Sequence, residues 1–354
     1  MLNTSKIYYG FNDVLIKGRP SSLDSRQSIN LNLDLSKFKN PLFKEWSPLP
    51  VMSANMDTVT DIEMAFELLK RNWIPVLHKY VSIVDISKLF DMIDNYNNII
   101  EKEKVIDYRN LFVSRGTSQA DKEKLIERLD SESRIKSVCI DVANGHRLSI
   151  IDYVKKLKKS VCKDKILMVG NVGTSEMLPF YVEAGVDIIK AGIGPGSACI
   201  TRVKTGVGTP QVSLIDELVT ANKNKDILIC SDGGCKNEGD IAKGFVAGAD
   251  FVMIGGMLSG FKESPGVVEM VNGLRFKRFS GMAAKESQLN GVPNYGTEEG
   301  KTVMIPYKGK VYHKLEDIEG GIRSACTYTD SKTINNLKNA TLIITNEQEN
   351  TSLK

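Results

Sequence analysis

The chain has 354 residues and a formal net charge of +4, with 42% hydrophobic and 25% charged residues. These values are ordinary for a globular protein and exclude a largely disordered chain. No run of about 18 apolar residues and no secretory apolar core occur, so we expect a cytoplasmic protein that does not cross a membrane. Positive charge is spread along the chain without a basic block interleaved with aromatic residues, which argues against a nucleic-acid surface.

Cysteine and histidine spacing gives no sign of a metal cluster. Cys230 and Cys235 are separated by four residues and no second pair accompanies them, so the six cysteines predict free, reduced thiols. His78, His146 and His313 are few and scattered, which predicts structural roles.

Short apolar runs predict eight strands, in chain order at 50–52, 75–77, 111–113, 137–140, 166–169, 186–189, 227–230 and 251–254. Apolar residues spaced by three and four predict helices between most of them, at 61–70, 119–129, 147–157, 175–183, 211–222 and 239–246. Strand, helix and strand in alternation predict parallel pairing. Because polar or glycine-rich sequence follows nearly every run, we expect an α/β fold of the closed (β/α)8 TIM-barrel type rather than an open sheet.

Residues 262–320 follow the eighth predicted strand and break this alternation. The segment is too long for an ordinary loop and is interpreted either as a mobile flap or as a surface excursion with a small sheet of its own. We expect a single catalytic barrel over residues 1–345 and a flexible tail over 346–354. Asp187 and Asp250 open two strands at the opposite end of the barrel, so neither is assigned a catalytic role.

A glycine-rich loop, GIGPGSACITRVKTGVG at 192–208, contains the most informative residue type, a single thiol. Cys199 follows a buried strand, Thr201 provides a hydroxyl two residues later, and Arg202 and Lys204 add positive charge. This setting favours a polarised cysteine nucleophile. The alternative is that Cys199 is a small apolar filler, which is the usual role of a free cysteine.

Several long segments resemble the inosine monophosphate dehydrogenase and GMP reductase family: FNDVLIKGRPSSLDSR, GPGSACITR, SDGG and GDIAKGFVAGADFVMIGGML. Within it, HKY, DVANGH, KTGVGTPQ, SDGGC, EEGKTVMIPYKG and GGIRSACTY are similar to the reductase branch. The resemblance covers almost the whole chain. It implies a (β/α)8 barrel, a purine nucleotide substrate, a nicotinamide cofactor and a homotetramer.

For the chemistry, the resemblance implies NADPH-dependent reductive deamination of GMP to IMP and ammonia, a step of purine nucleotide salvage. Cys199 would add to the purine C2 and form a thioimidate, because covalent catalysis divides a difficult substitution into two steps. The hydroxyl of Thr201, relayed from Glu299, would protonate the departing amine. The neighbouring Glu298 could be the proton source in place of Glu299. Alternatively, both carboxylates are simply solvated at the surface.

The resemblance also implies binding residues. Substrate contacts are expected at Ser197, Asp232, Gly233, Gly234, Gly255, Gly256, Gly281, Met282, Glu298 and Gly300. Cofactor contacts are expected at Ser25, Arg26, Lys79, Asp141, Val142, Ala143, Ile193, Gly194, Tyr295, Ser324, Ala325, Cys326 and Thr327. A potassium ion is expected at Gly194, Gly196, Cys199 and Arg202. A guanidinium beside hydroxyls suits a 2′-phosphate and favours NADPH over NADH, whereas Lys79 could instead pair with a nearby carboxylate.

Two other functions remain open. A dehydrogenase without the regulatory insertion would convert IMP and NAD to XMP, but the family's hydrolysis uses a flap arginine and tyrosine. This chain has Tyr295 and no arginine between Arg278 and Arg323. A catalytically silent purine-nucleotide-binding barrel is the third hypothesis. The chain departs from the reductase pattern at five positions: Ile200, Ser280, Ala283, Ala284 and Gly296. These departures put in doubt the phosphate pocket of a reductase and one of its contacts to the base or the cofactor.

Overall fold

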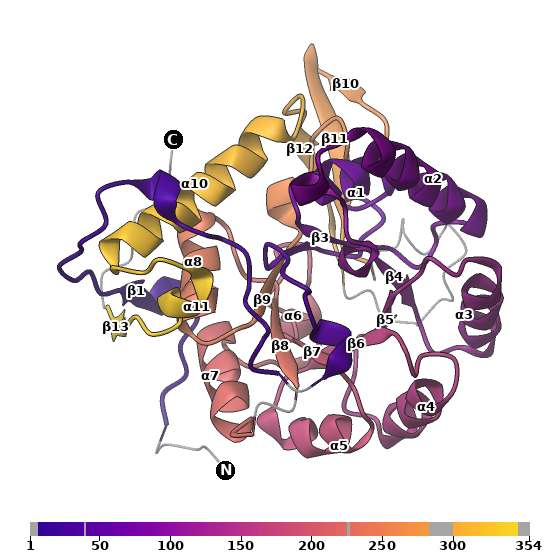
Figure 1. Cartoon of the computed structure of the whole chain (residues 1–354), viewed down its shortest axis with the longest axis horizontal. Coiled ribbons are helices and arrows are strands. Elements are labelled where there is room, and N and C mark those ends of the chain that lie inside the picture. The colour runs from indigo at the N-terminus through magenta and orange to yellow at the C-terminus, as the bar shows by residue number, and fades with distance from the viewer. Residues whose placement is uncertain (1–5, 39, 225–226, 283–299, 346–354) are drawn as a thin grey trace.

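Eight parallel strands close into a barrel in the computed structural model, which describes residues 6–38, 40–224, 227–282 and 300–345 (Figure 1). The strands are β2 (Val51–Ser53), β3 (Ile74–Leu77), β4 (Phe112–Arg115), β5 (Ser137–Asp141), β6 (Ile166–Val172), β7 (Ile188–Ala191), β8 (Leu228–Asp232) and β9 (Phe251–Ile254). Each pairs with the next, and β9 pairs with β2. All eight predicted runs fall on these strands, which confirms the (β/α)8 fold class.

Helices ring the strands (Figure 1). They are α1 (Ile62–Leu69), α2 (Ile83–Ile99), α3 (Gln119–Ser131), α4 (Leu148–Lys159), α5 (Leu178–Glu183), α6 (Thr201–Thr205), α7 (Gln211–Ala221), α8 (Glu238–Val246), α10 (Tyr312–Tyr328) and α11 (Ile334–Leu337). Ser82, Ser118 and Asn237 begin α2, α3 and α8, because each side-chain oxygen accepts the backbone N–H three residues later. Within the described ranges, none of these helices combines the length and apolar character that a membrane crossing requires.

Short 3-10 helices occur in the connections, as η1 (Phe11–Asp13), η2 (Arg26–Ser28), η3 (Pro41–Phe43), η4 (Lys102–Lys104), η5 (Tyr108–Asn110), η6 (Ser175–Met177) and η7 (Gly256–Leu258). Outside the barrel, β1 (Val14–Ile16) pairs antiparallel with β13 (Leu342–Ile344). This small sheet joins the two ends of the described chain, and the sequence analysis did not predict it.

The segment after β9 forms a three-stranded antiparallel sheet of β10 (Glu269–Val271), β11 (Leu274–Ser280) and β12 (Thr302–Pro306), which projects from the barrel (Figure 1). Residues 283–299, between β11 and β12, lie outside the described residues, as does the predicted tail at 346–354. The predicted flap included residues 312–320, but these residues begin α10, which packs against α8 as a barrel helix. The division into barrel, flap and tail stays a prediction.

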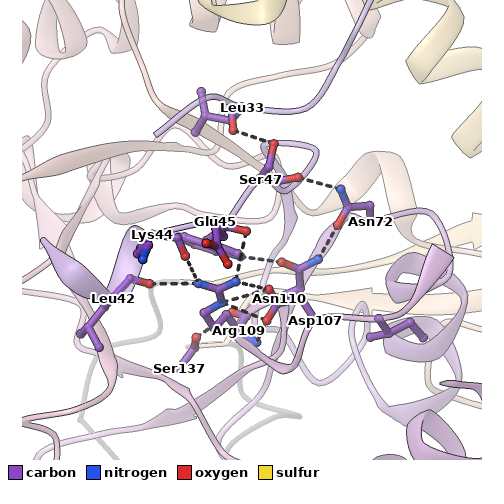
Figure 2. Close-up of polar contacts among 12 residues, drawn as sticks. Leu33, Leu42, Lys44, Glu45, Ser47, Asn72, Asp107, Arg109, Asn110 and Ser137 are labelled. Carbon is purple, nitrogen blue, oxygen red and sulfur yellow. Dashed lines mark hydrogen bonds and ion pairs between the residues drawn. The ribbon is translucent and has the colours of Figure 1, made fainter. Parts of the chain in front are cut away.

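The amino end of the barrel is tied to the N-terminal segment by hydrogen bonds. Figure 2 shows the Arg109 guanidinium directed at the backbone carbonyls of Leu42, Lys44 and Glu45, at distances of 3.3, 2.7 and 3.3 Å. Asp107 neutralises the same guanidinium at 2.5 Å. These contacts hold the segment that precedes β2 at the amino end of the barrel. The opposite end, where the strands have their carboxyl ends, is where barrels of this type carry their active sites.

The two strand-opening aspartates also make structural contacts at this end. Asp187 accepts hydrogen bonds from Lys158 and from the backbone N–H of Leu167, at 2.5 and 2.8 Å. Asp250 accepts from the backbone N–H of Ile229 and from Lys338, at 2.8 and 2.6 Å. Their carboxylates thus connect neighbouring strands to the surrounding helices and loops.

A prediction concerns Asn110, which is 1% exposed and lies in the same network (Figure 2). It accepts a hydrogen bond from the Trp46 indole at 2.7 Å and donates to Asn72 at 2.8 Å. Asn110→Leu should lower the free energy of unfolding by about 2–3 kcal/mol, because it leaves buried donors and acceptors unpaired. Urea unfolding measures the change. Asn98→Leu, at an exposed position of α2, is the control and should change it by less than about 0.5 kcal/mol. Equal effects would contradict the assigned role of Asn110.

Candidate active site

A cavity of about 230 Å³ lies where the carboxyl ends of the barrel strands meet. Six of the strands contribute to its walls, either directly or through the loops that follow them, so residues far apart in sequence converge there. The structure brings together, as lining residues, these predicted site residues: Asp141, Ala143, Ile193, Gly194, Gly196, Ser197, Cys199, Thr201, Asp232, Gly233, Gly234, Gly255, Gly256, Gly281, Met282 and Gly300. Their individual roles stay predictions.

Cys199 sits in the loop between β7 and α6, with its side chain at the cavity. Its Sγ lies 3.1 Å from the Thr201 hydroxyl oxygen, and its backbone N–H donates to the Gly196 carbonyl at 3.0 Å. Thr201 is the first residue of α6. The start of that helix therefore fixes the hydroxyl beside the sulfur.

A second thiol, Cys235, lines the same cavity and is the obvious rival nucleophile. Burial raises the pKa of Cys235 well above its ordinary value, which disfavours the reactive thiolate. Burial likewise raises the pKa of Cys139, Cys162 and Cys326 to about 12. Cys199 and Cys235 are both partly exposed, but the Cys199 sulfur lies beside the Thr201 hydroxyl, so Cys199 is the better candidate.

The base of the flap is joined to the cysteine loop by its backbone. Cys199 and Gly300 form an isolated antiparallel bridge, and the Lys301 N–H donates to the Ala198 carbonyl at 2.9 Å. Gly281 lies so close that a Cβ there would be 2.8 Å from the Ala198 carbonyl oxygen. Both ends of the undescribed part of the flap are thus held beside Cys199.

Three predicted residues of the flap cannot be placed in the cavity. Glu298, Glu299 and Tyr295 lie outside the described residues, together with the departures Ala283, Ala284 and Gly296. Glu299 directly precedes Gly300, whose backbone pairs with Cys199. This connection supports keeping Glu299 as a candidate.

A buried ammonium group connects the two predicted binding carboxylates. Lys190, the third residue of β7, is 3% exposed, and its Nζ lies 2.7 Å from Asp141 and 3.0 Å from Asp232. Asn171 donates to the same Asp232 oxygen at 2.7 Å and to the Gly192 carbonyl at 2.8 Å. Lys190 therefore orients side chains at the ends of β5 and β8.

The charges of this cluster shift each other's protonation. Burial opposes ionisation of Asp141, but the charge of Lys190 and its hydrogen bond outweigh burial and lower the pKa of Asp141 below its ordinary value. Burial similarly acts against the charged form of Lys190, yet Asp141 and Asp232 raise the pKa of Lys190 well above its ordinary value. The lysine stays charged across the physiological range.

Two adjacent glycines after β8 let the backbone approach a ligand. Gly233 and Gly234 have φ angles of +87° and +93°, which side chains rarely adopt. A Cβ on either residue would also lie within 3.2–3.4 Å of Pro195. The turn therefore requires glycine and leaves a narrow, side-chain-free wall next to Asp232.

The predicted residues for the far end of the cofactor form a separate cluster. Ser25, Arg26, Ser324 and Thr327 line a shallow depression between η2 and α10, and Arg26 donates to the Ser324 hydroxyl at 3.0 Å. This depression shares no lining residue with the cavity at Cys199. Cys326, which was also predicted to contact the cofactor, is 0% exposed and does not line this depression.

Lys79 and Val142, also predicted as cofactor residues, lie beside the cavity rather than in its lining. The Lys79 Nζ lies 5.3 Å from the centre of the Tyr80 ring, and within the described part of the chain it forms no ion pair. The alternative that Lys79 merely pairs with a carboxylate finds no support there. Its charge contributes to the lowered pKa of Asp141.

The predicted potassium site consists of backbone carbonyls. The Gly196 carbonyl already accepts the Cys199 N–H, and the Arg202 carbonyl accepts the Gly206 N–H, both at 3.0 Å. A carbonyl oxygen has a second lone pair, so these residues remain compatible with a cation. In the described ranges no cluster of three or more His, Cys, Asp or Glu could hold a metal. The potassium site stays a prediction.

The sequence analysis missed Asn171, Lys190 and Phe279, which also line the cavity. The sequence does contain a signal for Lys190, because it is a charged residue directly after the apolar run 186–189. A lysine that faces the interior at the end of a buried strand requires charged or polar partners. Asn171 comes two residues after the predicted run at 166–169 and lies near the carboxyl end of β6. Phe279 lies on β11, and its place in the cavity depends on the tertiary contact of the flap base.

These features define a class of protein: a (β/α)8 barrel with a cysteine at the strand ends, beside paired carboxylates and a glycine-rich wall. Residues 8–352 match the sequence model described as the IMP dehydrogenase / GMP reductase domain. The chain is 41% identical over 345 residues to the GMP reductases of Shewanella halifaxensis and Photobacterium profundum, covering 96% of each chain. It is 40% identical, with the same coverage, to the GMP reductase of Vibrio cholerae (strain M66-2).

The chain therefore belongs to the IMP dehydrogenase / GMP reductase family and is an enzyme of that family.

Lys190→Met provides a test of the charge cluster. The change leaves two largely buried carboxylates unpaired and should lower the free energy of unfolding at pH 7 by about 3 kcal/mol. In the wild type, the lowered pKa of Asp141 gives stability that is complete above the ordinary value of 3.8 and lost as pH falls below it. In the variant, Lys190 no longer offsets burial, so the pKa of the Asp141 carboxyl rises. The difference between the two proteins should therefore shrink as pH falls from 7 towards 5.

Thermal unfolding at several pH values measures this effect. Lys155→Met is the control, because Lys155 pairs with Glu183 at an exposed position, and the side chains are 37% and 73% exposed. It should be nearly neutral at every pH. A Lys190→Met difference that stays constant with pH would contradict the electrostatic role.

Proposed function

We propose that this enzyme catalyses the NADPH-dependent reductive deamination of GMP to IMP and ammonia. The observation that carries the proposal is the pairing of the Cys199 sulfur with the Thr201 hydroxyl in the barrel cavity, next to Asp232. Chain-long similarity to proteins named GMP reductase supports the choice of substrate. The reaction would serve purine nucleotide interconversion and salvage.

The reaction would proceed in two halves. The Cys199 thiolate adds to C2 of the guanine base, the C2–N2 bond breaks, and the amine leaves as ammonia after accepting a proton. NADPH, when bound, supplies a hydride to C2. The carbon–sulfur bond then breaks, which gives IMP and returns the thiolate. A thiolate suits both halves because it is a good nucleophile and a good leaving group.

The proton for the departing amine would come through Thr201, with Glu299 as its source. The Thr201 oxygen lies 3.1 Å from Sγ, so its hydroxyl is beside the carbon that the sulfur attacks. The Cys199–Gly300 backbone bridge supports Glu299 as the relay, since Glu299 directly precedes Gly300 in the chain. Glu298 remains the rival.

Binding roles follow from the placement of charge and open backbone. Asp232 would accept hydrogen bonds from the ribose hydroxyls. Gly233 and Gly234 would let the backbone approach the ribose or phosphate closely, and Gly255 and Gly256 would donate N–H groups to it. The cluster of Arg26 with Ser25, Ser324 and Thr327 combines a guanidinium with hydroxyls, which fits a 2′-phosphate and supports NADPH. The potassium ion, the homotetramer and the cytoplasmic location also belong to this proposal.

The dehydrogenase alternative is less favoured because the flap has no arginine between Arg278 and Arg323 to activate water. Product analysis separates the alternatives. GMP with NADPH should consume reduced nicotinamide and yield IMP and ammonia in equal amounts. Reduced cofactor formed from IMP and NAD would select the dehydrogenase, and GMP binding without turnover would select the silent barrel.

Cys199→Ala should lower kcat by roughly 10⁴-fold or more, while the Kd for GMP changes by about threefold or less, because the thiol supplies bond formation rather than binding surface. Steady-state assays and calorimetric titration measure the two quantities. Cys235→Ala, at the other thiol of the cavity, is the matched control and should keep kcat within about tenfold. Full activity of Cys199→Ala would refute the mechanism.

Glu299→Gln should slow ammonia release more than hydride transfer, because the amide cannot supply the proton. In single turnovers, we expect the deamination rate to fall by roughly 10²-fold or more while the subsequent hydride step changes little. Glu298→Gln is the control for the neighbouring carboxylate. If Glu298→Gln slows deamination and Glu299→Gln does not, the relay belongs to Glu298.

A further inference from the structure

The loop that carries Cys199 runs from residue 192 to residue 210, between β7 and α7, and it includes the short helix α6. Arg202 is the second residue of α6. Its Nε donates to the Ile193 carbonyl at 3.0 Å, and its Nη2 donates to the Thr209 carbonyl at 2.6 Å. Because these two carbonyls lie near opposite ends of the loop, one planar side chain closes the loop on itself.

Two glycines make room for the arginine side chain. Gly194 has a φ angle of +75°, and a Cβ there would lie 2.5 Å from the Arg202 Cγ. A Cβ on Gly208 would lie 2.6 Å from the Arg202 Nε and 2.9 Å from the Ile193 carbonyl oxygen. Real Cβ atoms do not make such close contacts, so any side chain at either position would displace the arginine. The two glycines therefore give the guanidinium a defined path through the loop.

Both ends of the loop are themselves held at the barrel. Ile193 is 7% exposed and lines the cavity. The Thr209 hydroxyl donates to the carbonyl of Gly173, which directly follows β6, at 2.6 Å. The two hydrogen bonds of Arg202 therefore connect α6 to parts of the chain that the barrel fixes. They hold in place the Thr201 hydroxyl and the sulfur beside it.

The charge of Arg202 also acts on the cysteine. Among the described residues no carboxylate pairs with Arg202, whereas Arg109 and Arg134 form ion pairs. Burial lowers the pKa of Arg202, and the negative charge of a Cys199 thiolate acts in the opposite direction. The guanidinium is thus near enough to the sulfur for their charges to interact, and a cationic neighbour favours a thiolate.

We infer that Arg202 is a positioning residue for the proposed reaction: its guanidinium closes the cysteine loop between two carbonyls and holds the Cys199 sulfur at the cavity beside a positive charge. A guanidinium fork can donate to both carbonyls at once, whereas the ammonium of lysine is a point charge on a flexible stem. This role rests on the proposed function, in which Cys199 is the nucleophile. The predicted potassium site concerns the backbone carbonyl of Arg202, but this role belongs to its side chain.

Alkylation by iodoacetamide, followed across pH by mass spectrometry of the Cys199 peptide, tests this role without turnover. Arg202→Met should raise the midpoint of the pH profile by roughly half a unit to one unit, because the thiolate loses a neighbouring cation. Arg202→Lys keeps the charge and should leave the midpoint within about 0.3 units of the wild type. The other charged groups described at the cavity, Asp141, Lys190 and Asp232, are the same in every variant.

Steady-state kinetics with GMP and NADPH, at one fixed concentration of potassium chloride, separate position from charge. Arg202→Met should lower kcat by roughly 10²-fold and Arg202→Lys by roughly tenfold, because neither side chain restores both hydrogen bonds. The KM for GMP should change by about threefold or less. Lys204→Met is the matched control, since it removes an exposed positive charge from the same helix. It should change kcat by less than about twofold and the alkylation midpoint by less than about 0.2 units.

An unchanged midpoint together with an unchanged kcat in Arg202→Met would overturn this role. Equal gains in alkylation of Cys199 and of the buried thiols Cys139 and Cys326 would also contradict it, because loss of the whole fold would then explain the effect. Full activity of Arg202→Lys would show that the two-pronged contact is not needed. A wild-type enzyme that does not turn over GMP would contradict the proposed reaction alone, since the alkylation profiles are measured without turnover.

Discussion

The candidate active site depends on one buried charge, the ammonium group of Lys190. It projects from β7 and contacts the carboxylates at the ends of β5 and β8, so three strands of the barrel share one electrostatic interaction. Removing these charges from water is costly unless they neutralise one another and are hydrogen-bonded. The contacts that compensate the burial of these charges also fix the orientation of Asp141 and Asp232 towards the cavity.

The second constraint is the backbone connection between the flap base and the cysteine loop. The backbone of the cysteine loop pairs with the base of the flap at the wall of the cavity. Cys199 forms a bridge with Gly300, and the Lys301 N–H donates to the Ala198 carbonyl. In the proposed mechanism, the residues that the flap carries would decide whether the intermediate on Cys199 reacts with water or with hydride.

Local sequence signals predicted the barrel because its strands are short, apolar and followed by turn residues. All eight predicted runs lie on strands, and six predicted helices lie on helical segments. The helix at 83–99 was missed, although Ile86, Leu89, Phe90 and Ile93 form its buried face. The helix at 312–328 was assigned partly to the flap, because no barrel strand comes after it and its role depends on packing against α8.

Sequence analysis picked out cavity-lining residues where the residue type alone carries the chemistry. Cys199 and Asp232 belong to that group, and the structure places both in the cavity. Lys190 and Asn171 were missed because their importance lies in contacts between strands that periodicity does not reveal.

Mass spectrometry of the enzyme mixed with GMP in the absence of reduced cofactor tests the central claim most directly. After rapid denaturation and digestion, the account predicts a peptide containing Cys199 whose mass is increased by that of GMP less ammonia. No such adduct, or its appearance on Cys235 instead, would contradict covalent catalysis at Cys199.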